Sequence, residues 1–270
     1  MNPIDVYWSS SHRNFGDVLT PLLLERLFGI PFRHVSYRRA ELVGLGSLLQ
    51  KYTVPRLHWL RRLQESRRPP LRVWCTGFIE PVAPGRVLPR RLAVAALRGK
   101  RSRAELERIT GERFEGPLGD GGLLVPHLLA KRPAIRHTFG LVPHYSDAAD
   151  PAVRELANRL PDAAVIDVLA EPLETLERIA SCRFILSSSL HGLIAADALG
   201  IPNRRLVFGG GLIGGDFKFD DYYSIYPQPP PPPLAPAEAA QLTPEAVESA
   251  YTIAPADVQA VQERLLAALK

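Results

Sequence analysis

Cysteine is scarce in this chain: Cys75 and Cys182 are the only two among 270 residues. They lie far apart in the sequence, and neither stands in a spacing typical of metal ligands. Such sparse use of cysteine favours a reduced compartment and argues against a small secreted scaffold built on disulfides. The sequence therefore predicts no metal site.

Long apolar runs are also missing. No segment approaches the roughly 20 apolar residues that a membrane-spanning helix needs. The first five residues lack the basic region and the long apolar region of a signal peptide, so we expect a cytoplasmic protein. The chain is nevertheless 46% hydrophobic, which is enough to bury a sizeable core and excludes global disorder.

Acidic residues are outnumbered by basic ones, with 28 Asp and Glu against 33 Lys and Arg. The net charge of +5 suits an anionic partner, such as a phosphate ester, an acidic lipid or a nucleic acid. Charge alone does not choose among these three classes of partner.

Strand and helix patterns alternate through the C-terminal half. The expected strands are 137–142, 163–169, 183–186 and 204–208, and the expected helices are 151–160, 172–181 and 190–199. Gly200 follows the last of these helices, with Pro202 just beyond it, as is usual at a helix end. The alternation predicts an α/β fold with a doubly wound parallel sheet.

The N-terminal half shows the same alternation less clearly. Strands are expected at 4–8, 71–74 and 92–96, and helices at 18–28 and 102–109, the second opened by a capping box of Ser102 and Glu105. We expect two Rossmann-like lobes, 1–132 on the acceptor side and 133–227. A Pro-rich connector and a C-terminal helix, together 228–270, are expected to pack back on one lobe. Ligands bind beyond the carboxyl ends of such strands, which predicts an active site in the cleft between the lobes.

One segment, from Phe184 to Pro202, combines a buried strand, a tight polar turn and a helix. Ser187, Ser188 and Ser189 fall in the turn, and His191 falls in the first helical turn. Free backbone N–H groups at such a helix start favour anions, and the hydroxyls add donors. A structural role for His191 stays open beside a catalytic one.

This segment resembles the hallmark of the polysaccharide pyruvyltransferase family, a Ser/Arg-x-His-Gly stretch followed by an Ala-rich helix and Gly-Ile-Pro. Further pieces similar to the family follow in order at 14–17, 98–102, 119–124, 142–144 and 217–223. The last two resemble the branch that makes ketals on exopolysaccharides, the xanthan type in particular. Ser189 stands where many members carry Arg, as is common in that branch, and Gly121 replaces the usual Pro.

The resemblance implies a ketal pyruvyltransferase, which moves a pyruvyl group from phosphoenolpyruvate to a terminal sugar of a lipid-linked exopolysaccharide repeat unit. It implies two lobes resembling the GT-B glycosyltransferase architecture, with phosphoenolpyruvate as donor substrate and no cofactor. The expected partners are a lipid-linked oligosaccharide and the anionic inner leaflet of the membrane, and no nucleic acid.

The resemblance also suggests roles for individual residues. His191 is the expected general acid. Donor binding is expected from Arg98, Ser187, Ser188, Ser189, Lys218 and Gly210. The acceptor or cleft residues are expected to be Asn14, Gly16, Asp17, Asp120 and His144. Simpler alternatives stay open: Arg98 as a solvated surface residue, Asp17 as a helix N-cap, and His144 in loop packing.

Three further segments have two interpretations each. Residues 54–68 place five arginines beside Leu57, Trp59, Leu60 and Leu63, which fits either a membrane-surface segment or a solvated helix face. The prolines at 229–233 form a stiff connector or, in principle, an SH3-type ligand. The aromatic residues within 217–223 either stack on sugars or pack in the core.

Two other functions compete. A nucleotide-sugar glycosyltransferase of the GT-B type would share the architecture, but Glu171, Glu174 and Glu177 lack the Glu-x7-Glu spacing of many retaining transferases. A non-catalytic carbohydrate-binding or scaffold protein would not need His191, Arg98 and the Asn-x-Gly-Asp turn together.

Overall fold

The computed structural model describes residues 2–11, 14–209 and 214–269. Its N-terminal sheet has five strands, all parallel, in the order β2-β1-β3-β5-β7. These strands are β1 (Ile4–Tyr7), β2 (Phe32–His34), β3 (Leu42–Val43), β5 (Leu71–Thr76) and β7 (Leu92–Leu97). A separate antiparallel pair is formed by β4 (Val54–Pro55) and β6 (Arg86–Val87).

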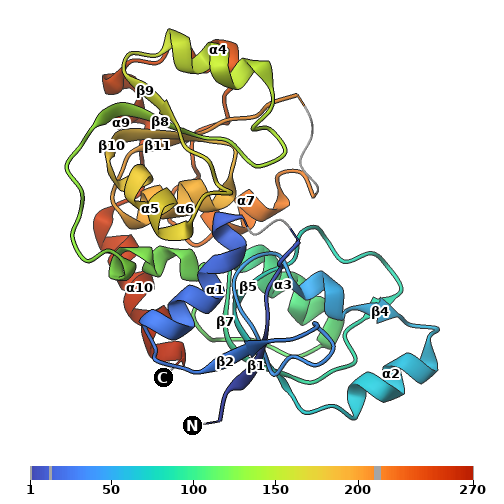
Figure 1. The fold of residues 1–270 in the computed structure, drawn as a ribbon. Coiled ribbons are helices and arrows are strands. Elements are labelled where there is room, and N and C mark those ends of the chain that lie inside the picture. The colour runs from blue at the N-terminus through green and yellow to red at the C-terminus, as the bar shows by residue number, and fades with distance from the viewer. Residues whose placement is uncertain (1, 12–13, 210–213, 270) are drawn as a thin grey trace.

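The C-terminal sheet has four parallel strands in the order β11-β10-β8-β9. They are β8 (His137–Val142), β9 (Ala163–Val165), β10 (Cys182–Ser187) and β11 (Asn203–Arg205). Figure 1 shows the two sheets in separate halves of the molecule, each with helices around it. The predicted α/β class with two Rossmann-like lobes is confirmed. The likeness to GT-B transferases and the domain limits stay predictions.

The helices connect the strands. In the N-terminal part they are α1 (Phe15–Arg26), η1 (Leu49–Tyr52), α2 (Trp59–Ser66), α3 (Lys100–Thr110) and η2 (Gly121–Leu128). The C-terminal part contains α4 (Pro151–Arg159), α5 (Pro172–Ala180), α6 (Leu190–Ala198), α7 (Phe217–Tyr223), α8 (Pro236–Ala239), α9 (Pro244–Ala250) and α10 (Pro255–Leu269). Of these, α1, η2 and α6 pack against one another where the lobes meet. Within the described ranges, no helix combines the length and the hydropathy needed to cross a bilayer.

One hydrophobic cluster runs continuously through both lobes. It joins Leu19 and Leu23 of α1 to Leu124 of η2 and Ile194 of α6, all with no exposed surface or almost none. Burying an aliphatic side chain of this size stabilises the fold by roughly 1.5–3 kcal/mol. The lobes are therefore held together by shared core packing.

The last helix packs against the N-terminal lobe. It contacts β5, β7 and η2, and Figure 1 shows it alongside that lobe. Gln262 donates a hydrogen bond to the carbonyl of Leu123 at 2.7 Å. Gly119 faces α10 so closely that a methyl group there would lie 2.5 Å from Val261. The chain thus returns to its first lobe after completing the second.

Two local predictions about helix starts are wrong. Helix α1 begins at Phe15 rather than at residue 18, because Asn14 is the N-cap. Helix α3 begins at Lys100, and no capping box forms between Ser102 and Glu105. The Ser102 hydroxyl bonds to Asp221 instead, and Glu105 accepts from the backbone of Val82. Both side chains therefore bond to groups that are distant in the sequence, and neither is left to cap the helix.

The proline run lies beside the last strand of the C-terminal sheet. Leu234, just after the run, pairs with Leu206 in a parallel bridge, and its carbonyl accepts from Val207 at 3.0 Å. Arg204 donates to the carbonyl of Pro232 at 3.0 Å. These bonds fasten the connector to the edge of the sheet.

Candidate active site

The first turn of α1 lies at the junction of the two lobes. Asn14 Oδ1 accepts from the backbone N–H of Asp17 at 3.2 Å, and Asn14 Nδ2 donates to Asp17 Oδ2 at 2.7 Å. Asn14 is thus the cap, and the alternative that Asp17 caps this helix is wrong. The N–H of Phe15 donates to the carbonyl of Val168 at 2.7 Å, which bonds the helix start to the other lobe.

His191 lies in the first turn of α6, and its ring packs directly on Gly16 of α1. A methyl group at Gly16 would lie 1.9 Å from His191 Nδ1, so a side chain at this position would displace the ring. The His191 side chain is 14% exposed, and its Nε2 lies 3.8 Å from Asp120 Oδ1. The structure thereby brings together three predicted site residues that are far apart in the sequence.

Two buried polar atoms at this point have no hydrogen-bond partner among the described residues, His191 Nε2 and Asp120 Oδ2. The other carboxylate oxygen of Asp120 accepts from the N–H of Gly122 at 2.8 Å, at the start of η2. A buried polar atom without a partner costs about 1–3 kcal/mol, so native proteins retain few of them. Because two such atoms, His191 Nε2 and Asp120 Oδ2, lie close together, we interpret this point as a site that binds a ligand or a proton.

The surroundings of His191 control its charge. Burial is the largest influence and lowers its pKa below the usual value. The negative charge of Asp120 raises the pKa, while the positive charges of Lys218 and Arg98 lower it. In the free protein the imidazole is therefore neutral at pH 7, and an anion bound nearby would favour its protonated form.

Two of the three serines in the turn after β10 hold the turn together. The Ser187 hydroxyl is fully buried and donates to the carbonyl of Val142 at 2.7 Å, while it accepts from Ser189 N–H at 3.0 Å. The Ser188 hydroxyl donates to Asp147 at 2.6 Å and accepts from the N–H of His144 at 2.9 Å. A role of these two hydroxyls in donor binding stays a prediction and would require them to exchange partners.

Ser189 differs from its neighbours. It is the N-cap of α6, and its hydroxyl makes no capping hydrogen bond. The helix N-terminus adds unpaired backbone N–H groups at the same place, an arrangement that favours anions. Of the three serines, Ser189 has the hydroxyl that is available to a ligand.

Arg98 follows β7, as predicted, but its side chain is completely buried. Nε donates to Asp221 Oδ2 at 2.9 Å, Nη1 to Ser47 at 2.6 Å, and Nη2 to the carbonyl of Phe78 at 2.5 Å. The alternative that Arg98 is a solvated surface residue is wrong. Asp221 also accepts from Ser102, so the ion pair fastens α7 to the start of α3. Donor binding by Arg98 stays a prediction.

Lys218, on α7, is a second cation near His191. Burial is the main reason that its pKa falls to about 8, and the positive charges of Arg98 and Arg205 lower it further. The carboxylates of Asp147 and Asp17 act in the opposite direction. Among the described residues no carboxylate forms an ion pair with Lys218, in contrast to Arg98. Its ammonium group is thus available to a bound anion.

His144 lies beside the serine turn. Its Nδ1 is 2.7 Å from the hydroxyl of Ser146, and its ring lies 4.2 Å from that of Tyr145 between centroids. It is thereby connected through Ser188 to Asp147, which the sequence analysis did not include. Asp147 follows β8 in a polar loop at the carboxyl end of the sheet, and this position is the signal that could have identified it. The predicted donor residue Gly210 lies outside the described residues.

A groove with a volume of about 610 Å³ lies between α1 and the segment that precedes α5. Both lobes contribute to it: Trp8 and Val18 from the first, and Leu169 and Glu171 from the second. The ring of Trp8 lies 4.0 Å from that of His34 between centroids. On α1 the lining residues run from Val18, one turn beyond Asn14, to Arg26 at the end of the helix.

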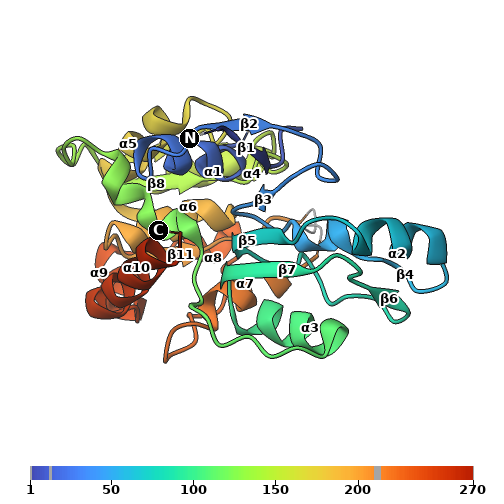
Figure 2. The ribbon, with the colours of Figure 1, turned by 90° about the horizontal axis from the view of Figure 1, so that it is seen from below.

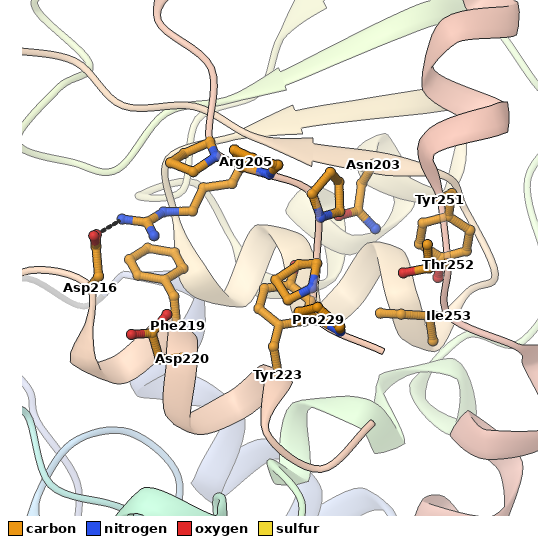
Figure 3. Close-up of a pocket in the computed structure, with 14 residues that line it drawn as sticks. Asn203, Arg205, Asp216, Phe219, Asp220, Tyr223, Pro229, Tyr251, Thr252 and Ile253 are labelled. Carbon is orange, nitrogen blue, oxygen red and sulfur yellow. Dashed lines mark hydrogen bonds and ion pairs between the residues drawn. The ribbon is translucent and has the colours of Figure 1, made fainter. Parts of the chain in front are cut away.

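A second, smaller pocket of about 220 Å³ lies beside α7 and the proline run (Figure 3). Arg205 pairs there with Asp216 and lies over Phe219, with its guanidinium carbon 3.7 Å from the ring centroid. Phe219 and Tyr223 are buried, so these aromatic residues pack in the core instead of presenting faces for sugar stacking. Tyr222 is buried as well and donates to Asp197 at 2.8 Å.

Acidic, histidine and cysteine side chains do not gather into a potential metal site within residues 2–11, 14–209 and 214–269. The junction itself offers several groups that can react or bind. A neutral imidazole, a carboxylate beside it, an available lysine and the helix start at Ser189 can together bind an anion and move a proton.

Comparisons with known proteins identify the segment that carries this junction. Residues 127–207, which include the serine turn and His191, match the family model described as polysaccharide pyruvyl transferase. Succinoglycan biosynthesis protein ExoV of Rhizobium meliloti (strain 1021) is 29% identical over 224 residues, 80% of this chain and 62% of that protein. An uncharacterized protein of Acanthamoeba polyphaga mimivirus is 36% identical over 136 residues, 48% of this chain and 47% of that protein.

The chain thus spans about half to three fifths of the length of these two relatives. The family match contains the serine turn and His191 but not Lys218, and the similarity to ExoV extends beyond it over most of the chain. On these grounds the chain resembles the polysaccharide pyruvyl transferase family, and residues 127–207 carry the match to its model.

Proposed function

We propose that this protein is a ketal pyruvyltransferase of exopolysaccharide synthesis. It transfers the pyruvyl group of phosphoenolpyruvate to a terminal sugar of a lipid-linked repeat unit and releases phosphate. The observation that carries the proposal is the contact of His191 with Gly16, with Nε2 unpaired and 3.8 Å from Asp120. The family match over residues 127–207 supports the same reaction class.

Donor binding requires positive groups and N–H donors, because phosphoenolpyruvate carries a carboxylate and a phosphate. Lys218, the Ser189 hydroxyl and the N–H groups at the start of α6 supply these functions in our proposal. Arg98 adds positive electrostatic potential to the site, since its charge lowers the pKa of both His191 and Lys218. The Arg98 side chain itself positions α7 through Asp221.

His191 acts as the general acid. The donor's negative charges raise its pKa and make it imidazolium in the donor complex, which reverses the effect of burial in the free protein. The carboxylate of Asp120 lies 3.8 Å from Nε2 and stabilises the imidazolium, which then transfers a proton to the donor. Asp120 is thus a positioning residue that fixes the ring and its protonation.

The reaction then proceeds without any change in oxidation state. The methylene carbon of phosphoenolpyruvate takes the proton and becomes a methyl group, while the neighbouring carbon gains oxocarbenium character. One sugar hydroxyl adds to that carbon and returns its proton to His191. The bond to phosphate breaks, the second hydroxyl closes the ketal, and its proton leaves with the phosphate.

The acceptor sugar approaches along the groove between α1 and the segment before α5. Trp8 offers an apolar ring face to a sugar, and the carboxylate oxygens of Glu171 can accept hydrogen bonds from sugar hydroxyls. Asn14 and Asp17 lie at the start of α1, close in sequence to Gly16, which contacts His191, and to Val18, which lines the groove. They would orient the attacking hydroxyl. The reaction takes place at the cytoplasmic face of the plasma membrane, where the lipid-linked acceptor is presented.

The test is phosphate release from phosphoenolpyruvate across a panel of lipid-linked oligosaccharides, with His191→Gln as the inactive control. Release with at least one acceptor, and its loss in the variant, is the expected result. Thermal stabilisation by nucleotide sugars and none by phosphoenolpyruvate would instead assign the chain to nucleotide-sugar glycosyltransfer.

A further inference from the structure

An unusual apolar surface surrounds helix α2. Four neighbouring side chains are largely exposed: Leu57 by 90%, Trp59 by 65%, Leu60 by 57% and Leu63 by 42%. They make up half of the exposed large apolar side chains in the described part of the chain, yet they lie within seven consecutive positions. Scattered exposed leucines need no explanation, but a cluster of this kind marks a contact surface.

The helix is attached to its lobe by polar contacts. No residue of α2 is buried. Arg61 donates to the hydroxyl of Tyr37 at 3.2 Å, and Arg68, just after the helix, donates to the carbonyl of Arg38 at 2.5 Å. An ordinary surface helix places its apolar face on the core and its polar face in water. Here the apolar residues are the exposed ones.

Positive charge surrounds this apolar surface. Arg56, Arg62 and Arg67 are exposed, and Glu65 is the only acidic residue between positions 54 and 68. Glu65 is already paired with Arg68. Arginines around a Trp/Leu surface are the combination that binds the headgroup region of an anionic membrane, with the apolar side chains inserted and the guanidinium groups at the phosphates.

The position of α2 leaves the junction of the lobes uncovered. In Figures 1 and 2, α2 and the neighbouring β4 project from the N-terminal lobe, on the side away from α9 and α10. A surface that is bound through this projection contacts neither α6 nor the start of α1.

We propose that α2 and Leu57 form a docking surface for an anionic lipid bilayer. A second copy of the chain fits less well, because a symmetric contact through this surface would bring two sets of arginines together. The surface itself is independent of the proposed function. Its purpose, to hold the enzyme near a lipid-linked acceptor, rests on that function.

Flotation of the purified protein with lipid vesicles tests the proposal directly. We expect the chain to float with vesicles that contain phosphatidylglycerol, to float far less with phosphatidylcholine alone, and to lose binding as salt is raised. Trp59→Ser combined with Leu60→Ser should reduce the bound fraction about tenfold or more. Arg62→Glu combined with Arg67→Glu should abolish the preference for anionic vesicles.

Matched controls come from exposed residues elsewhere. Ile135→Ser removes a 54% exposed apolar side chain, and Arg154→Glu with Arg159→Glu reverses two exposed charges on α4. Both control proteins should float like the unchanged protein. Circular dichroism and thermal unfolding should be unchanged in all variants, since the substituted side chains are exposed.

Two results would overturn the proposal. One is the absence of flotation with both vesicle types at low salt. The other is a dimer in solution that Trp59→Ser dissociates while vesicles are not bound, which would assign the surface to a second copy.

Phosphate release with a water-soluble acceptor tests the proposed function separately from the docking surface, because the docking variants should retain that activity. A chain that floats but never releases phosphate would contradict the proposed function alone.

Discussion

Gly16→Ala is the most direct perturbation of the contact between the lobes. The added methyl group would lie 1.9 Å from His191 Nδ1, 2.4 Å from Cγ and 2.6 Å from Cε1. Favourable contact begins at about 3.5 Å, so the ring would have to move by about 1.5 Å. The backbone at Gly16 is not in the left-handed region, and alanine therefore meets no conformational barrier of its own.

The size of the expected effect follows from two opposing contributions to stability. Overpacking costs about 1–3 kcal/mol, and alanine in a helix contributes up to about 1 kcal/mol in favour of the folded state. A net loss of about 1–2 kcal/mol lowers the melting temperature by only a few degrees. Catalysis is more sensitive, because misplacing a catalytic group by about 1 Å can cost a hundredfold in rate.

Phosphate release and urea unfolding measure the two effects separately. We expect turnover to fall by about a hundredfold with a small loss of stability. In the background of His191→Ala, which removes the ring, Gly16→Ala should no longer destabilise the protein, and the double-mutant cycle should give a coupling of about 1 kcal/mol or more. Wild-type turnover in folded Gly16→Ala, or additive effects on stability, would refute the contact as the basis of the site.

Four more changes test the remaining arguments. His191→Gln should fold normally but lose turnover by about a hundredfold or more, with a much smaller loss of phosphoenolpyruvate affinity by calorimetry. Because the pKa of Lys218 is about 8, donor affinity should fall as pH rises through 8, and Lys218→Arg should remove that decrease. Asp221→Asn leaves Arg98 buried without its charge partner and should lower the free energy of unfolding in urea by about 3–5 kcal/mol. Burial raises the pKa of Asp197 to about 7, so the native state binds more protons than the unfolded state. Stability in urea should therefore fall as pH rises from about 4 to 7, and Asp197→Asn should flatten this dependence.

Sequence reasoning located elements whose limits are marked by local signals. The bounds of β8 were predicted correctly, because Pro143 stops the strand. Strands β2 and β3 were missed, since three and two residues are too few to show a period. The start of α1 was placed three residues late because Asn14 and Asp17 are both good capping residues.

The candidate site was predictable in its residue types but not in its contacts. His191 and Asp120 belong to motifs that the sequence displays, yet nothing local indicates that Gly16 would receive the His191 ring. Arg98 was expected to face the cleft, but its partner Asp221 lies 123 positions later in the sequence. A pairing of that range is decided by the tertiary fold, which places α7 against α3.

The return of the chain to its first lobe has a consequence for its synthesis. When residues 1–132 have left the ribosome, Arg98 has no Asp221 to pair with, and the surface of β5, β7 and η2 that α10 later covers is bare. A buried arginine without its carboxylate is strongly unfavourable, so this lobe is expected to stay incomplete until α7 and α10 have been synthesised. Nascent chains that wait in this state expose apolar surface, which is what chaperones bind. Expression of the N-terminal lobe alone should accordingly give aggregated protein, and adding residues 214–270 as a separate peptide should rescue part of it.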